Sequence, residues 1–247
     1  YPFAEQAQTI YYNKSKLTAD DVKTWDGLTA KGVLATDFTN AYNFYPVFLS
    51  AGTQLYGKTG ETVKGTDINS AKGEQAMAWF AQQKSNKGVM QTSNALNQLK
   101  SGKAAAILDG PWNSANIKKI LGKNFAVAPY PTIKLDGKDV QMQAFLGIAT
   151  FAVNSHASGS NQKAAATLAS FITNKESQLI VYDHSGQIPV DKTAQKSSKV
   201  ASDPVAGAVM TMAKTGNSTL MPKMPQMATF WNDAAPLING AYTGSVP

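Results

Sequence analysis

The stretch Ala104-Ala105-Ala106-Ile107-Leu108-Asp109-Gly110-Pro111-Trp112 decides the fold class. Its first five residues are apolar and have the length of a strand that is buried on both faces. The Asp-Gly-Pro sequence that follows is typical of a turn, and Ile117, Ile120 and Leu121 come after it at helical spacing. A buried strand that leads directly into a helix indicates an α/β fold, in which helices flank a sheet.

The same alternation of strands and helices continues on both sides of this stretch. Asp136-Gly137 predicts a hairpin between 132–135 and 138–140. Further strands are expected over 9–13, 125–130 and 147–154. Helices are expected after an N-cap at Asn69 or Ser70 with an end at Gly88, after an N-cap at Ser93 with an end at Gly102, over 162–172, from Asp203-Pro204 to 212, and over 229–241, where Pro236 should kink or shorten the last helix.

The composition argues against several classes of protein. The net charge is +7, yet all 23 basic residues are dispersed Lys and none is Arg, which disfavours nucleic-acid binding. The absence of Cys excludes thiol catalysis, zinc–thiolate sites and iron–sulfur clusters. No run approaches the about 20 apolar residues that span a bilayer. The chain opens at Tyr1 without Met or a signal peptide, so a processed or truncated start is expected.

Catalytic motifs are not evident. His156 and His184 are expected in polar surface loops, and no nucleophile elbow, zinc-protease motif or phosphate loop occurs. Glu61 and Glu74 lie in a glycine-rich turn and on a helix, so they do not form the opposed carboxylates of a glycosidase. Asp109 is the one carboxylate in a site-like position, and we expect it to end its strand by bonding local backbone amides.

Aromatic residues are the informative class. Trp112 follows a turn at the carboxyl end of a strand, where open α/β folds place their ligand crevice. Phe230-Trp231 and the pair Tyr42 and Tyr45 are further candidates for platforms on which a sugar ring could stack, although each alone is more often a core residue. Trp79 is assigned to the core because it shares a helical face with other apolar residues.

Three segments carry a family resemblance, in order and at matching spacing. They are Tyr1-Pro2-Phe3-Ala4 with Tyr11-Tyr12-Asn13-Lys14, then Asp109-Gly110-Pro111-Trp112, then Met221-Pro222-Lys223-Met224-Pro225-Gln226-Met227-Ala228-Thr229-Phe230-Trp231. In these the chain resembles the maltose/maltodextrin-binding proteins, the extracellular solute-binding components of bacterial ABC sugar importers. The likeness extends over essentially the whole chain, and the third segment is its most specific part.

The resemblance implies a periplasmic-binding-protein type II-like fold with two α/β lobes and a sugar in the cleft between them. It implies a truncated two-lobe architecture, without most of the amino-terminal lobe and without the family's last helix. Residues 1–5 would be a hinge segment, 6–147 and 203–247 the carboxyl-terminal lobe, and 148–202 a returning part of the amino-terminal lobe.

Site residues follow from the resemblance one by one. Trp112 and Trp231 match two stacking tryptophans, and Tyr42 matches a stacking tyrosine. Asn40 and Gln6 stand where the family has carboxylates that accept bonds from sugar hydroxyls. An amide can still donate and accept, but without the strength that a charge adds, so affinity for maltose itself should change. Ala235 and Asn232 replace an Arg and a Tyr, so a different chain length or linkage is expected at that end.

The expected function is therefore binding of maltose/maltodextrin-type oligosaccharides without chemical change. The partners are an oligosaccharide and the membrane permease of an importer. A monomer at the outer face of the bacterial membrane, lipid-anchored in the parent protein, or in the periplasm is expected, with no nucleic acid, cofactor or metal. The alternatives are a binder of another oligosaccharide, a glycan-degrading enzyme and a structural surface protein.

Overall fold

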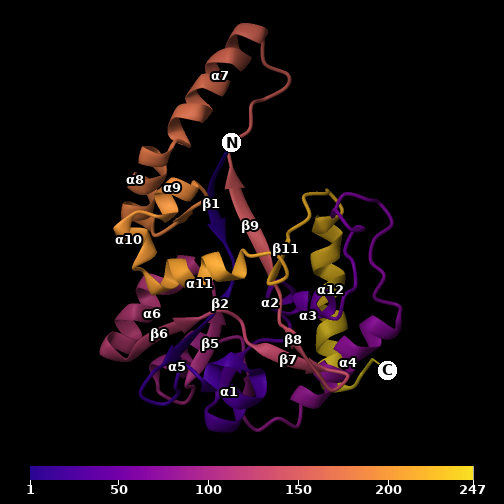
Figure 1. Cartoon of the computed structure of the whole chain (residues 1–247). Helices are drawn as coiled ribbons and strands as arrows, with labels where there is room; N and C mark the ends of the chain where they lie inside the picture. The colour runs from indigo at the N-terminus through magenta and orange to yellow at the C-terminus, as the bar shows by residue number, and fades with distance from the viewer. Residues whose placement is uncertain (247) are drawn as a thin grey trace.

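A computed structural model describes residues 1–246 of the chain, and Pro247, the last residue of the expected carboxyl-terminal lobe, lies outside them. Figure 1 shows a broad lower body and a segment of helices that projects from it. We call residues 1–150 with 203–246 the body, and residues 151–202 the projecting segment. The fold is mixed α/β, as the sequence predicts.

A five-stranded mixed sheet forms the base of the body. The strand order is β4-β3-β5-β2-β6, with β3 parallel to β4 and β5 and with β2 antiparallel to β5 and β6. The predicted strand over 9–13 is confirmed in both bounds. The strand predicted at 104–108 begins later, at Ala106, and the strand predicted at 125–130 ends earlier, at Ala128. The bounds are β2 Thr9–Asn13, β3 Leu34–Thr36, β4 Val89–Gln91, β5 Ala106–Asp109 and β6 Phe125–Ala128.

Helices pack against this sheet. They include α5 (Ala95–Lys100), α6 (Ser114–Leu121) and α11 (Pro204–Met212), which contact strands of the sheet. The helix predicted from Asp203-Pro204 to 212 is confirmed. Its start is fixed because Asp203 accepts from the backbone N–H of Val205 and Pro204 suits the first turn. The N-cap of α5 is Asn94 rather than Ser93, so that prediction is one residue early.

A second, four-stranded sheet joins the body to the projecting segment. Its order is β10-β1-β9-β11, and β9 pairs antiparallel with β1 and parallel with β11. The prediction of a strand over 147–154 is wrong in its bounds, because β9 begins earlier and ends earlier. The bounds are β1 Pro2–Gln6, β9 Ala144–Thr150, β10 Ile188–Pro189 and β11 Ser218–Leu220.

An aromatic core fills the other side of the body. There, α2 (Ala41–Phe44), α3 (Pro46–Ser50), α4 (Ala71–Gln83) and α12 (Met227–Thr243) pack together. Trp79 is buried, as expected. Tyr45 is also buried, at 1% exposure, and is therefore a core residue and not an exposed platform. The α12 helix continues through Pro236, so the expected shortening of this helix does not occur.

Two smaller features follow the sequence closely. The hairpin pairs β7 (Thr132–Leu135) with β8 (Lys138–Gln141), and both turn residues have positive φ, 50° at Asp136 and 73° at Gly137. The α4 helix has Ser70 as its N-cap but ends before the predicted stop at Gly88. Short helices complete the body: α1 Trp25–Lys31, η1 Asp21–Lys23, η2 Pro111–Asn113 and η3 Gly122–Asn124.

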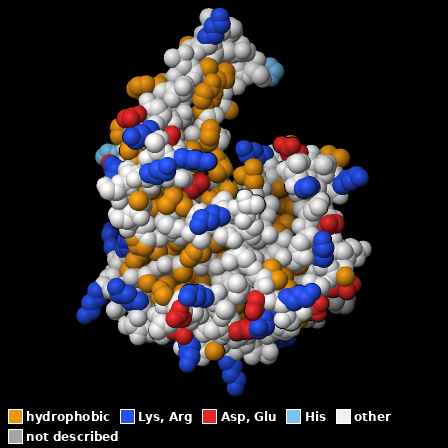
Figure 2. All heavy atoms as spheres, viewed as in Figure 1, with side chains coloured by type: hydrophobic (Ala, Val, Ile, Leu, Met, Phe, Trp, Pro, Cys, Tyr) orange, Lys and Arg blue, Asp and Glu red, His pale blue; other side chains and the backbone are white. Residues whose placement is uncertain are grey.

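The projecting segment consists of α7 (Gly159–Ile172), α8 (Lys175–Ser185), α9 (Lys192–Gln195) and α10 (Ser198–Ala201). His184 lies in the last turn of α8, so its predicted place in a loop is wrong, although its side chain is exposed. Figure 2 shows hydrophobic side chains on the surface of this segment. Within residues 1–246, no helix combines the length and the apolar character that a membrane crossing requires.

Candidate functional site

The turn after β5 holds Trp112 in an exposed position. The backbone carbonyl of Gly110 accepts a hydrogen bond at 3.2 Å from the buried hydroxyl of Tyr11. A Cβ placed on Gly110 would lie 2.1 Å from the indole of Trp112, so only glycine lets the ring fold back over the turn. The Trp112 side chain is 54% exposed. Its ring is thus fixed on one side by the backbone and open to solvent on the other.

Asp109 supports this turn. Its Oδ1 accepts from the backbone N–H of Gly110 at 2.7 Å, and its Oδ2 accepts from the side-chain amide of Asn113 at 2.7 Å. Burial raises the pKa of Asp109, while these two hydrogen bonds act in the opposite direction. The carboxylate therefore ends its strand by bonding a local backbone amide, as the sequence predicts.

Three predicted aromatic residues meet at one place. The ring of Tyr42 lies between the two indoles, with its centroid 6.3 Å from Trp112 and 6.2 Å from Trp231. Phe145 of β9 packs beneath them, 5.9 Å from Tyr42 and 5.7 Å from Trp231. We call Tyr42, Trp112 and Trp231 the aromatic cluster. Residues far apart in the sequence thereby form one surface, whose rings reach it from η2, α2 and α12.

Asn40 lies beside Trp112 and caps α2. Its Oδ1 accepts from the backbone N–H of Asn43 at 3.2 Å, which leaves its side-chain NH2 group to donate elsewhere. Asn40 and Trp112 also line a polar pocket of about 230 Å³. The other residues that line it are Gln8, Thr36, Asp37, Asn43, Thr92, Ser93, Ala95, Leu108 and Asp109.

Gln6 lies on the sheet face that carries Phe145. It pairs with Gly147 across β1 and β9, and a Cβ on Gly147 would lie 3.0 Å from the Gln6 side chain. Side chains two residues apart on a strand share one face, so Gln6 is on the face of β9 that carries Phe145. Glycine at 147 leaves the Gln6 side chain room on that face.

The arrangement suits a neutral ligand with flat apolar faces and polar edges. Aromatic faces bind C–H surfaces, while amides and carboxylates at the edge bind hydroxyl groups. Burial raises the pKa of Tyr42 to about 12, so its hydroxyl stays protonated at neutral pH and can donate. Among residues 1–246, no group of three or more His, Cys, Asp or Glu is placed to hold a metal ion.

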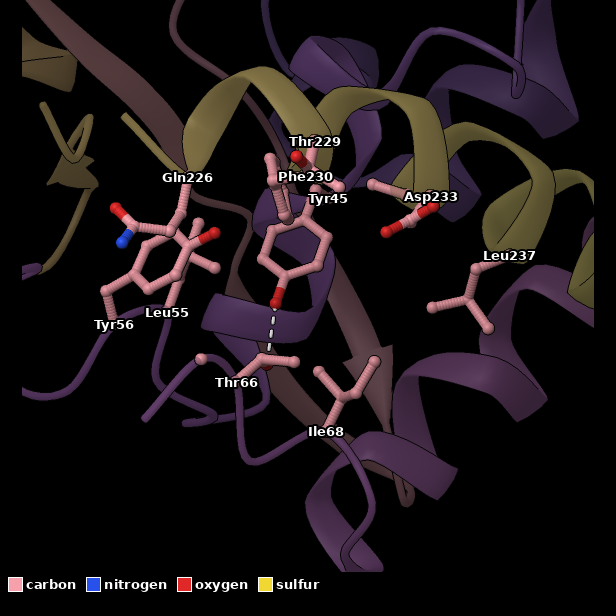
Figure 3. Close-up of a pocket in the computed structure, with 12 residues that line it drawn as sticks. Tyr45, Leu55, Tyr56, Thr66, Ile68, Gln226, Thr229, Phe230, Asp233 and Leu237 are labelled. Carbon is pink, nitrogen blue, oxygen red and sulfur yellow. Dashed lines mark hydrogen bonds between the residues drawn. The ribbon is translucent and has the colours of Figure 1, made fainter. Parts of the chain in front are cut away.

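A second pocket, of about 400 Å³, lies against α12 (Figure 3). Tyr45, Phe230 and Leu237 contribute to its mostly apolar lining, and the Tyr45 hydroxyl lies 2.7 Å from Oγ1 of Thr66. Trp231 does not line it. Polar side chains such as Gln226 and Asp233 also line this pocket, but neither Trp112 nor Trp231 does, so the aromatic cluster with its polar pocket is the better candidate for a ligand that stacks on exposed rings.

Sequence reasoning missed three features near the site. Phe145 was not among the expected site residues, and Thr36 and Asn43, which line the polar pocket, are marked by no motif. Glu5 of β1 is half-buried, accepts from the side-chain amide of Gln195 at 3.2 Å, and has its pKa raised to about 7 by burial. No local pattern in Ala4-Glu5-Gln6 indicates this half-buried carboxyl.

Comparisons with known proteins place the chain in a family. Residues 1–208 match the family described as bacterial extracellular solute-binding protein. A maltooligosaccharide ABC transporter solute-binding lipoprotein of Streptococcus pneumoniae (strain R6) is 28% identical, covering 98% of this chain and 60% of that protein. A galactooligosaccharide-binding protein of Bacillus subtilis is 25% identical, with 98% and 61% covered.

The chain spans about 60% of the length of these curated relatives. It is also similar to a solved structure titled maltodextrin binding protein MalE1 from L. casei BL23 without ligand. That structure has a TM-score of 0.97 and 98% sequence identity, covering all of this chain and 66% of that one. The family match extends over most of the chain and includes β1, β5 and the turn that carries Trp112. This chain therefore belongs to the bacterial extracellular solute-binding proteins.

Proposed function

We propose that the chain binds malto-oligosaccharides on the aromatic cluster, as part of the solute-binding component of an ABC sugar importer. The observation that carries the proposal is the position of Tyr42 between Trp112 and Trp231, with centroids about equally far from both indoles. Three rings side by side offer platforms for successive sugar units. The names of the similar proteins support this class of ligand.

Asn40 and Gln6 would bind sugar hydroxyls at the edges of the rings. The oxygen of Asn40 already accepts the backbone bond that caps α2, so its NH2 group would donate to the sugar. A carboxylate at this position could cap the helix with one oxygen and accept with the other. The amide therefore favours a sugar oxygen that accepts a hydrogen bond, and it lacks the added strength of a charge.

Binding would use two lobes that close on the sugar. In this proposal residues 1–5 belong to the hinge, residues 6–147 and 203–246 to one lobe, and residues 148–202 to the other. Ligand contacts with both lobes would stabilise the closed state. The exposed apolar side chains of the projecting segment support the division, since Leu168 and Phe171 of α7 are 59% and 67% exposed and would pack against the rest of the second lobe in a longer chain.

The protein would deliver the sugar unchanged to a membrane permease at the outer face of the cell membrane or in the periplasm, and would act as a monomer. Both carboxylate positions of the family are amides here, and the oxygens of Asp109 are held by Gly110 and Asn113. Oδ1 of Asp37, the other acid that lines the polar pocket, accepts from the backbone N–H of Thr39 and the side-chain amide of Gln91, so we expect the two acids to hold local structure and not to act as a hydrolytic pair.

A different oligosaccharide is the second candidate ligand. The observation in its favour is the 25% identity to a galactooligosaccharide-binding protein over the same length as the maltooligosaccharide-binding relatives. The aromatic cluster would serve either sugar, because both present C–H faces. The two would differ in how their hydroxyls meet Asn40 and the polar pocket.

Titration calorimetry with a series from maltose to maltotetraose, beside galacto-oligosaccharides of equal length, tests the proposal. We expect saturable binding of the malto series. Tighter binding of the galacto series would favour the second candidate, and no binding of either would overturn both. Chromatography of each ligand after incubation should show no product. Cleavage that is lost in Asp109→Asn would contradict the non-catalytic assignment.

A further inference from the structure

Lysines that are dispersed in the sequence gather at one edge of the five-stranded sheet. The end of β2 and the starts of β5 and β6 are neighbours there. The backbone N–H of Lys14 donates to the carbonyl of Asn124 at 2.9 Å, which joins the end of β2 to the start of β6. The side chain of Lys16 donates to the carbonyl of Gly102, in the segment before β5. Five lysines lie in the segments that meet here, and we call them the lysine edge: Lys14, Lys16, Lys100, Lys103 and Lys123.

The positive charge of the lysine edge has no counterpart in its own segments. All five side chains are exposed, and within residues 1–246 none of them forms an ion pair. The segments 13–19, 98–105 and 121–125 contain no Asp or Glu. Five like charges on adjoining segments create a positive potential that attracts anions.

The acids that follow the first of these segments do not neutralise the edge. Asp20 pairs with Lys23, with the two charged atoms 2.6 Å apart. Asp21 accepts two hydrogen bonds from Thr18 at 2.7 Å, and these, together with the charge of Lys31, hold the pKa of Asp21 below its usual value. Each of these acids thus has a lysine of its own outside the edge.

The residue types at the edge favour phosphate groups along a polymer. Lys binds phosphate as a compact point charge, and the chain has no Arg for planar, bidentate contacts. None of the exposed large apolar side chains within residues 1–246 belongs to the lysine edge or its segments. A nucleic-acid base would therefore find no ring to stack on, and a bilayer no side chain to take up at its interface. A chain of phosphodiesters needs only repeated positive charges.

The lysine edge and the aromatic cluster lie at opposite ends of the same strand. β5 begins at Ala106 beside the edge and ends at Asp109, which supports the turn that carries Trp112. In Figure 1, α5, β5 and β6 lie in the lower part of the body, away from α7 at the top. A polymer on the edge would therefore leave the aromatic cluster open to a sugar and free to face a permease.

We propose that the lysine edge binds a linear polymer of phosphodiester groups in the bacterial cell envelope. The chain belongs to an extracellular family, so such a polymer would meet it outside the membrane. The five lysines would contact successive phosphates and release the counterions bound to them, so binding weakens as salt is added. This interaction goes beyond sugar binding and does not depend on it. It would hold the protein in the envelope with the aromatic cluster free.

Two variants of equal charge test the proposal, with long-chain inorganic polyphosphate as the probe. The edge variant combines three substitutions: Lys14→Gln, Lys103→Gln and Lys123→Gln. Three other exposed lysines, without an ion pair within residues 1–246, make the control variant: Lys58→Gln, Lys64→Gln and Lys138→Gln. Both variants lose three positive charges, so a difference between them reports the position of the charges and not their sum.

Calorimetric titration at several salt concentrations measures the binding. A single-stranded polyanion releases about 0.7 counterion per neutralised phosphate, so five contacts predict a slope of about −3.5 for the logarithm of the association constant against that of the salt concentration. In the edge variant the slope should become shallower by about 2, and binding at low salt should be about 10- to 100-fold weaker. The control variant should stay within about threefold of wild type. Both variants should keep the unfolding temperature of wild type.

Three outcomes would overturn the proposal. Wild type that does not bind polyphosphate would do so, and equal losses in the two variants would mean that net charge alone attracts the polymer. Vesicles of phosphatidylglycerol are the second probe, and binding to them without binding to polyphosphate would make a membrane surface the partner. The result is separate from the sugar site, because a failure to bind maltotetraose would refute the proposed function and leave these measurements unchanged.

Discussion

Helices α11 and α7 show how differently the body and the projecting segment are covered. In nine residues α11 buries Val205, Ala206, Ala208, Val209 and Met212, whereas α7 buries only Ala169 in fourteen. Yet α7 also carries large apolar side chains, Leu168 and Phe171, which are exposed. The apolar residues of a helix therefore determine how many side chains it can bury, and the neighbouring elements determine how many are buried.

The largest expected effect separates the two regions by stability. Phe38→Ala removes a fully buried ring that packs 4.4 Å from Phe44, and we expect a loss of about 3–5 kcal/mol. Phe171→Ala truncates an exposed ring on the projecting segment and should change stability by less than about 0.5 kcal/mol. Urea unfolding followed by circular dichroism measures both changes.

A similar loss for both variants would mean that Leu168 and Phe171 of α7 are already covered in solution, for instance by a second copy of the chain. The longer protein offers a second test of α7. In the 98% identical protein, the corresponding Phe→Ala change should cost about 3 kcal/mol, because there the rest of the second lobe would cover the ring.

The next effect compares binding by one lobe with binding by two. If contacts from both lobes hold the sugar, the longer 98% identical protein should bind maltotetraose at least about tenfold more tightly than this chain. Calorimetric titration of both proteins in one buffer gives the ratio. Equal affinities would contradict the two-lobe mechanism.

A pH-dependent effect is expected at the junction of the two regions. Glu5 on β1 faces Gln195 of α9, and burial raises its pKa from 4.5 to about 7. The folded state thus binds the proton more tightly than the unfolded state, so this contribution to stability is full below about pH 4.5 and is lost as the pH rises through about 7. In Glu5→Gln the change of Tm between pH 5 and pH 7.5 should shrink by about 2–6 °C, discounted for the partial exposure of Glu5.

Thermal unfolding of wild type and Glu5→Gln across this range measures the difference. Glu74→Gln is the control, because its carboxylate is exposed on α4. Parallel pH profiles for wild type and Glu5→Gln would show that Glu5 ionises in the folded protein as it does in the unfolded chain.

The smallest effects concern ion pairs at the surface. Lys134 and Asp139 in the body hairpin are 3.1 Å apart and about half exposed, and Lys199 and Asp183 form a comparable pair on the projecting segment. Double-mutant cycles should give less than about 1 kcal/mol for each pair. A coupling of several kcal/mol on the projecting segment alone would mean that charges stabilise that region in place of apolar burial.

Sequence reasoning located elements well where a local signal fixes both ends. Strand 9–13, the Asp136-Gly137 hairpin and the helix at Asp203-Pro204 are correct to the residue or nearly so. Bounds were missed where tertiary pairing decides them, as in β9, whose early start depends on its pairing with β11. The α8 helix was overlooked although Asn174 caps its start and Gly186, with φ of 70°, follows its end.

The site was predictable in its aromatic part and not in its polar part. The Gly-Pro-Trp turn, the Phe-Trp pair and Tyr42 were candidate platforms from the sequence, and the family resemblance matched Trp112, Trp231 and Tyr42 to stacking residues. Phe145 lies under the rings because β9 passes beneath α2 and α12. Residue spacing along the chain does not predict this contact between distant segments. Thr36 and Asn43 look like ordinary strand and helix residues until the fold leaves their oxygens without partners.

The decisive test of the aromatic cluster as the sugar site is titration of this chain with maltotetraose, in wild type, Trp112→Ala and Leu168→Ala. We expect saturable binding by wild type, a loss of about 1–3 kcal/mol or about 5- to 150-fold for Trp112→Ala, and full affinity for Leu168→Ala on the projecting segment. Wild type that does not bind, or that binds no better than Trp112→Ala, would contradict the assignment of the aromatic cluster as the sugar site.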